Sequence, residues 1–144
     1  MKKILLVCIA IFASISTVFA YKIGDIIEVA GAKGVVFEIT SDGQHGKVIS
    51  VTDGECNWEA AKQWCARYGK GWRMPSKDEL SKIKDAPARI NLALEEKGYA
   101  IMMFSHWSST EAGSGHALYV DIFSGDIDYD AKSNNHHVRA VCSF

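Results

Sequence analysis

The sequence predicts an α+β fold in which short antiparallel sheets flank two or three helices in the middle of the chain. Runs of β-branched residues broken by turn residues occupy residues 26–52. Helical apolar spacing with capping signals follows over residues 57–98, and extended runs return over residues 107–143. Strands, then helices, then strands is the order typical of an α+β domain.

The first 20 residues have the three zones of a cleavable signal peptide. Two lysines precede the apolar run Ile4–Ile15, and a small-residue cleavage site ends at Ala20. The run is too short, and its far flank too polar, for a transmembrane helix. We therefore expect cleavage of residues 1–20 and export of a single domain, residues 21–144, to the periplasm or the cell exterior.

Charge and hydropathy exclude two classes of partner for the mature chain. Loss of the two lysines in residues 1–20 changes 16 basic and 17 acidic residues to 14 and 17, a net charge of −3. A mildly acidic chain without a basic run does not predict nucleic-acid binding. No later segment is apolar enough to predict a membrane span.

Three strands are expected near the mature N-terminus. Ile26–Val29, Val35–Thr40 and Lys47–Thr52 are rich in β-branched residues and are separated by glycine-containing turns. We interpret them as a β-meander.

The first predicted helix begins after Asn57, a plausible N-cap. Gly69 is expected to end this helix in a left-handed conformation. One face of the helix carries a stripe about 120° wide, which is typical of a core-facing side. The residues of this stripe are Trp58, Ala61, Trp64, Cys65 and Tyr68.

Two further helices are predicted from their start signals. Ser76 and Glu79 have the spacing of a capping box. Pro87 is suited to the first turn of the next helix, with Ile90 and Leu94 facing inward and Gly98 as the stop.

The last third of the chain returns to strands. Trp107–Thr110 is one candidate, and Ala117–Phe123 turns at Ser124-Gly125 into Asp126–Asp130. His137–Ser143 is expected as a single closing strand. The two-residue period places Val138, Ala140 and Cys142 on one face of it.

Particular strings resemble known domains. Trp58-x-x-Ala61-x-x-x-Cys65, followed by Gly71-Trp72-Arg73-Met74-Pro75-Ser76-x-x-Glu79-Leu80, is similar to the first helix and connector of C-type-lectin-like domains. More narrowly, three later strings resemble the bacterial exported family of the C-terminal domain of the Legionella collagen-like protein (Lcl_C-like). They are Trp107-Ser108-Ser109-Thr110-Glu111, Lys132-Ser133-Asn134-Asn135 and Val138-Arg139-Ala140-Val141. The resemblance covers residues 56–144 and implies a C-type-lectin-like fold.

The resemblance also implies a disulfide. Signal-peptide removal leaves Cys56, Cys65 and Cys142, and their spacing alone does not choose a pair. In C-type-lectin-like folds the first helix is commonly bonded to the last strand, which implies Cys65–Cys142 here. Cys56 is then the odd thiol, and Cys56–Cys65 is the rival pair.

No metal or cofactor site is predicted. Asp126, Asp128 and Asp130 share one strand face, but a helix-loop-helix calcium loop would need glycine at Ala131 and glutamate at His137. A solvated strand face is the better interpretation. The five histidines lack zinc-ligand spacing, and most are expected in loops or on the surface. These are His45, His106, His116, His136 and His137.

A ligand-binding surface is expected in the loops that follow the family strings, because such loops gather at one end of the sheet in C-type-lectin-like folds. The two loops are residues 111–116 and 132–136, which are polar and contain glycine or asparagine. The predicted ligand-facing residues are Glu111, Ser114, His116, Asn134 and Asn135.

Three functions are compatible with the sequence. The first is an exported, non-enzymatic recognition or adhesin-like module that binds a glycan or protein ligand at the loop end. The second is a structural subunit of a larger exported assembly, linked through Cys56. The third is an enzyme using Cys56 or a histidine, which requires a reactive thiol, or a histidine beside a carboxylate in a pocket. No catalytic constellation is evident, which favours the first.

Overall fold

Helices and strands follow the predicted order along the chain. The computed structural model describes residues 19–144, so the predicted signal peptide lies almost wholly outside the described residues. The described strands are β1 (Ile26–Val29), β2 (Ala32–Ile39), β3 (Gly46–Ser50), β4 (Gly54–Cys56), β5 (Ser105–Glu111), β6 (His116–Asp121), β7 (Ile127–Ala131), β8 (His136–Val138) and β9 (Val141–Ser143). The helices are α1 (Trp58–Tyr68), α2 (Lys77–Lys84) and α3 (Pro87–Glu96).

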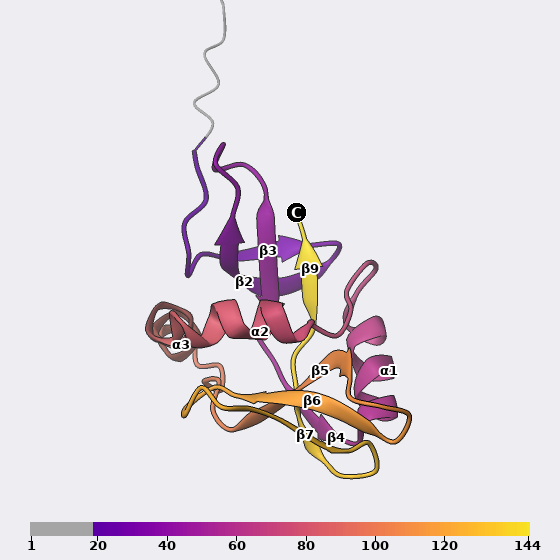
Figure 1. Ribbon diagram of the computed structural model, residues 1–144. Helices are drawn as coiled ribbons and strands as arrows, with labels where there is room; N and C mark the ends of the chain where they lie inside the picture. The colour runs from indigo at the N-terminus through magenta and orange to yellow at the C-terminus, as the bar shows by residue number, and fades with distance from the viewer. Residues whose placement is uncertain (1–18) are drawn as a thin grey trace, which may run out of the picture.

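The described strands form two sheets. Sheet A has the order β1-β2-β3-β9, and sheet B has the order β4-β8-β5-β6-β7. The paired strands are antiparallel except for β5 and β8, which run parallel. Helix α2 crosses between the two sheets, and α1 lies to one side of them (Figure 1).

The last segment of the chain joins the two sheets. The expectation of one closing strand over residues 137–143 is wrong, because β8 pairs with β4 and β5 in sheet B whereas β9 pairs with β3 in sheet A. Arg139 and Ala140 form the step between them. Val138, Ala140 and Cys142 are all buried in one cluster, so the two-residue alternation continues across the step and hides it in the sequence.

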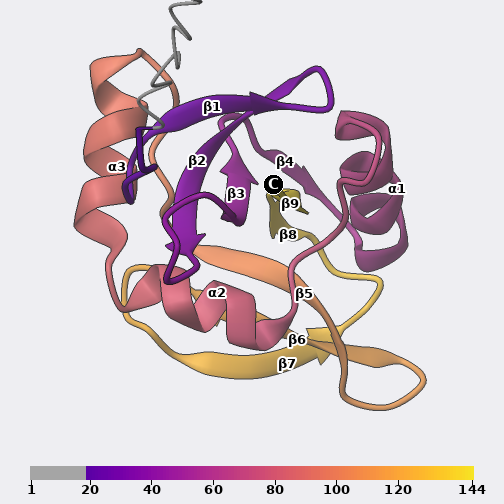
Figure 2. The same cartoon turned by 90° about the horizontal axis from the view of Figure 1, so that it is seen from above.

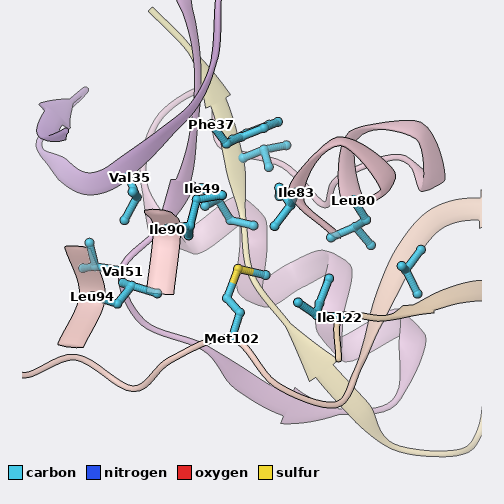
Figure 3. Close-up of a cluster of buried hydrophobic side chains, with 12 residues drawn as sticks. Val35, Phe37, Ile49, Val51, Leu80, Ile83, Ile90, Leu94, Met102 and Ile122 are labelled. Atoms are coloured by element: carbon cyan, nitrogen blue, oxygen red, sulfur yellow. The ribbon is translucent and has the colours of Figure 1, made fainter. Parts of the chain in front are cut away.

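Two apolar clusters make up the core. The first lies between sheet A, the helices α2 and α3, and β6 (Figure 3). Its buried residues are Val35, Phe37, Ile49, Val51, Leu80, Ile83, Ile90, Leu94, Met102, Val120, Ile122 and Val141. The second cluster packs α1 and the connector after it against strands of both sheets. Its buried residues are Val36, Val48, Trp58, Ala61, Cys65, Trp72, Met74, Trp107, Ala117, Val138, Ala140 and Cys142.

The predicted helix starts are confirmed. The Asn57 side chain accepts a hydrogen bond from Ala60 N at 3.0 Å, and Pro87 occupies the first turn of α3. Ser76 and Glu79 form both bonds of the capping box. These caps satisfy amide groups that a helix N-terminus otherwise leaves without partners.

Gly69 ends α1 for a different reason from the one expected. Its φ of 177° is extended backbone, so no left-handed turn requires glycine there. A Cβ atom at this position would lie 2.7 Å from the Trp72 ring and 3.2 Å from Ala32. Glycine is needed because the ring packs directly on the backbone.

A partly buried ion network fixes the connector between α1 and α2. Arg73 donates to both carboxylate oxygens of Glu79 at 2.8 and 2.6 Å, and Lys47 Nζ lies 3.1 Å from the same carboxylate. Burial alone would raise the pKa of Glu79. The hydrogen bonds from Arg73, Ser76 and Lys47 outweigh burial and lower that pKa to about 2. Arg73 is thus a salt-bridge partner of Glu79.

Arg139 lies fully buried at the step between the sheets. Its guanidinium donates to Ser50 O at 2.8 Å and to Ala100 O at 2.6 Å, and it lies 3.8 Å from the Asp53 carboxylate. One side chain therefore connects β3, the segment after α3 and the β8–β9 step. Arg139 is thus a buried ion-pair partner of Asp53, although its two shortest bonds go to carbonyls.

His106 is buried beside Arg139, which corrects the expectation that most histidines lie in loops or on the surface. Its Nδ1 lies 3.2 Å from Phe104 O, and its Nε2 has no partner within the described chain. Burial lowers the pKa of His106 to about 4, and the charges of Arg139 and His137 act in the same direction. His106 is therefore neutral in the folded protein at neutral pH.

Replacement of Arg139 tests its role at the step. Arg139→Met leaves the buried Ser50 carbonyl and the Ala100 carbonyl without this donor and Asp53 without its cation, so we expect a loss of about 3–5 kcal/mol in the free energy of unfolding. Denaturant unfolding measures it. Arg67→Met, the same change at an exposed position of α1, is the control and should cost less than about 0.5 kcal/mol. Equal effects of the two substitutions would contradict the assignment.

His106 predicts a pH dependence of stability. Below pH 6.5 the unfolded chain takes up a proton at His106, whereas the folded chain does so only near pH 4. The free energy of unfolding should therefore decrease as the pH is lowered from 6.5 to about 4, by on the order of 3 kcal/mol. His106→Gln removes this titration, so the slope of stability against pH should be shallower in the variant. Parallel slopes for the two proteins would refute the prediction.

Candidate ligand-binding surface at the loop end

The structure brings the two predicted loops together. Residues 112–115 connect β5 to β6, and residues 132–135 connect β7 to β8. Both loops lie on the α1 side of sheet B (Figure 1). Lys132 N donates to Gly115 O at 2.9 Å, so the loops are joined through their backbones.

Lys132 also joins the loops through its side chain. Its ammonium donates to the Glu111 carboxylate at 2.6 Å and to Ser114 O at 3.0 Å. These interactions lower the pKa of Glu111. Two of the predicted ligand-facing residues thus have a fixed position relative to the second loop, through a lysine that was not in the predicted set.

The ring of Trp58 packs against the side chain of Lys132. The Lys132 ammonium lies 4.3 Å from the centre of the Trp58 ring, within the range of a cation–π interaction. Trp58 N donates to Lys132 O at 3.1 Å, and the indole N–H donates to Ser108 O at 2.8 Å. The first residue of α1 therefore anchors the second loop to the core.

The other predicted residues occupy different positions on the same end. His116 begins β6 and packs edge-on against Tyr129, with ring centres 5.7 Å apart. Asn134 Nδ2 donates to Asp130 at 2.8 Å. Asn135 is exposed.

His136 organises the base of the second loop. With its proton on Nε2 it donates to Asp130 Oδ2 at 2.8 Å, and Nδ1 accepts from the Ser105 hydroxyl at 2.5 Å. Its ring stacks on Tyr119 and meets Trp107 edge-on, at 4.5 and 4.4 Å between ring centres. The hydrogen bond from His136 lowers the pKa of Asp130.

The bonds Ser105–His136–Asp130 have the order of a hydrolase triad, but the surroundings favour a structural role. The His136 ring is held between two aromatic side chains, and its side chain is only 11% exposed. Neither Ser105 nor His136 lines any of the five hollows found on the described chain. A histidine beside a carboxylate is present here, and none of these five hollows opens onto it.

The largest of these hollows lies elsewhere, on α1, and was not predicted. It has a volume of about 520 Å³. Trp64 and Tyr68 stack with ring centres 5.5 Å apart and are half-buried, although the helical stripe assigned both to the core. The lining residues are Cys56, Ala60, Gln63, Trp64, Arg67 and Tyr68. The stripe is thus wider than the buried face of the helix.

The cysteines do not form the expected bond in this structure. Cys56, Cys65 and Cys142 are all free thiols, and no two are at disulfide distance. Burial raises the pKa of Cys65 to about 12, with a smaller effect from nearby Cys56. Cys142 instead lies next to Arg73, with its thiol 3.5 Å from Ser143 O. The Cys65–Cys142 pairing therefore stays a prediction.

The described residues contain neither a metal-binding cluster nor a membrane-spanning helix. Within residues 19–144, no group of three or more histidine, cysteine, aspartate or glutamate side chains is arranged to hold a metal ion. None of the described helices is both long and apolar enough to span a bilayer.

The chain is similar to solved structures at low sequence identity. Botrocetin is 12% identical, with 68% of this chain and 89% of that chain covered and a TM-score of 0.44. EMS16, an antagonist of the collagen receptor integrin alpha2beta1, is 15% identical, with 68% and 90% covered and a TM-score of 0.42. No curated protein matches the sequence. The two sheets and the three helices of the described residues make the fold α+β, as expected. The Lcl C-terminal domain family matches residues 33–142, and this chain belongs to that family.

Proposed function

We propose that this chain is an exported, non-enzymatic recognition module that binds its ligand on the surface formed by residues 111–116 and 132–135. The observation that carries the proposal is the position of Lys132, which bonds to both loops and rests on the Trp58 ring. Loops fixed in this way lose little conformational entropy on binding. Binding residues also concentrate in loops held by a rigid scaffold.

The chemistry of the surface favours a hydrogen-bonding ligand. Ser114, His116 and Asn135 are exposed and offer hydroxyl, imidazole and amide groups. Glu111 adds a carboxylate that is paired with Lys132. A glycan, or a polar loop of a protein, presents complementary groups. Family membership supports a binding role over catalysis.

Export and the Cys65–Cys142 bond belong to the same proposal. Both are tested on protein recovered from an exporting bacterial cell. We expect an N-terminus at Tyr21 and, in a peptide map without reductant, a linked pair containing Cys65 and Cys142. A chain that retains Lys2 and Lys3 would refute export. A linked Cys56–Cys65 pair would refute the proposed bond.

Binding at the loop end is tested with a glycan array and a panel of extracellular proteins. For any hit, Asn135→Ala should weaken binding about two- to tenfold through loss of one hydrogen bond. Lys132→Met, which keeps the aliphatic stem but removes the ammonium, should weaken it further because both loops loosen.

Lys70→Met, the same change at an exposed site after α1, is the matched control and should leave binding unchanged. Hits that bind all three variants as tightly as the unmodified protein would place the binding surface elsewhere.

A further inference from the structure

The outer edge of sheet B is open. β7 is the last strand in the order β4-β8-β5-β6-β7, and no strand within residues 19–144 pairs with its outer side. Ile127 and Tyr129 are 42% and 61% exposed. β7 runs along the margin of the molecule (Figure 2). An open edge offers unpaired main-chain groups to another extended chain.

Two amides on this edge are covered by side chains of β7 itself. Asp121 N donates to Asp126 O, so the even-numbered backbone groups of β7 face β6 and the odd-numbered groups face outward. Tyr129 N donates to Asp128 Oδ1 at 2.8 Å, and Ala131 N donates to Asp130 Oδ1 at 2.7 Å. These two outward amides, of Tyr129 and Ala131, are thus each bonded to the aspartate that precedes them.

The two aspartates differ in how firmly they are held. Asp130 also accepts from His136 and Asn134, both at 2.8 Å. Asp128 has only the bond from Tyr129 N among the described residues. Asp128 can therefore release the Tyr129 amide at the cost of one exposed hydrogen bond, whereas Asp130 stays in place.

Charge indicates which extended chain fits the edge. Asp128 and Asp130 share one face of β7 with Asp126, and Asp121 lies across from them on β6. Burial and these four carboxylates raise the pKa of Tyr119, which pairs with Asp128. A second copy of β7 would bring like charges together at this edge, whereas a basic strand would neutralise them.

We propose that the β7 edge binds an extended peptide with basic side chains at alternate positions, which adds to sheet B as a further strand. The peptide residue opposite Tyr129 exchanges both main-chain hydrogen bonds with it. The side chain of that residue lies on the face of Ile127 and Tyr129, where an apolar group fits. The flanking side chains lie on the aspartate face, where the released Asp128 carboxylate pairs with a lysine. This inference does not rest on the loop-end proposal.

The test uses the blocked, fluorescent peptide Lys-Val-Lys-Val-Lys and measures anisotropy on the purified protein. We expect binding that weakens with salt, and slower hydrogen exchange at the Tyr129 amide. Glu-Val-Glu-Val-Glu should not bind. A lysine peptide N-methylated at the valines cannot form the ladder and should bind at least tenfold more weakly. Equal binding of the methylated and unmethylated peptides would refute strand addition.

Variants of the protein test the same geometry. Asp128→Asn should weaken the lysine peptide about two- to fivefold, as expected for an exposed ion pair. Glu95→Gln, the same loss of charge on α3, should not. Tyr129→Pro removes the outward amide and should abolish binding, with circular dichroism to confirm that the variant folds. Sedimentation that instead shows a dimer with a protected Tyr129 amide, without peptide, would overturn the proposal in favour of a second copy.

Discussion

The two sheets depend on the burial of a single guanidinium at the point where the chain leaves one sheet for the other. Arg139 donates to Ser50 O in sheet A and to Ala100 O after α3, and it faces the Asp53 carboxylate. A buried cation is costly unless its donors are used. Those bonds form only when β3, the segment after α3 and the β8–β9 step are all in place. Arg139 therefore links the native position of each of these segments to that of the others.

Local features could be predicted from the sequence because their causes lie within a few residues. Asn57, the Ser76–Glu79 box and Pro87 each act on the first turn of their own helix, so their spacing alone identified the helix starts. The longest strand, β2, was likewise evident from its β-branched residues. The core positions of α1 were partly predictable, since Ala61 and Cys65 are buried as the stripe indicated.

Features set by distant segments could not be predicted in this way. β4 has only three residues, Gly54–Cys56, and exists because β8 lies beside it. His106 is buried because β8 and Arg139 enclose it, and nothing in the surrounding sequence indicates that. Lys132 was part of a family string but acquires its role only from Glu111, Ser114 and Trp58. The two loops lie side by side as expected, whereas the residue that joins them was missed.

The acidic run of Asp126, Asp128 and Asp130 serves two purposes, one at the loop end and one at the β7 edge. Asp130 belongs to the loop base through His136 and Asn134, while its other bond covers the Ala131 amide. Alternation places Asp128 on the same face, but no histidine or asparagine reaches it. An acidic face that only needed solvation would not require its carboxylates to bond to the outward amides of their own strand. Bonds of this kind block edge pairing by an uncharged or acidic strand, yet a lysine can exchange with the amide at Asp128. The run therefore both protects the edge and selects the charge of a strand that could displace that protection.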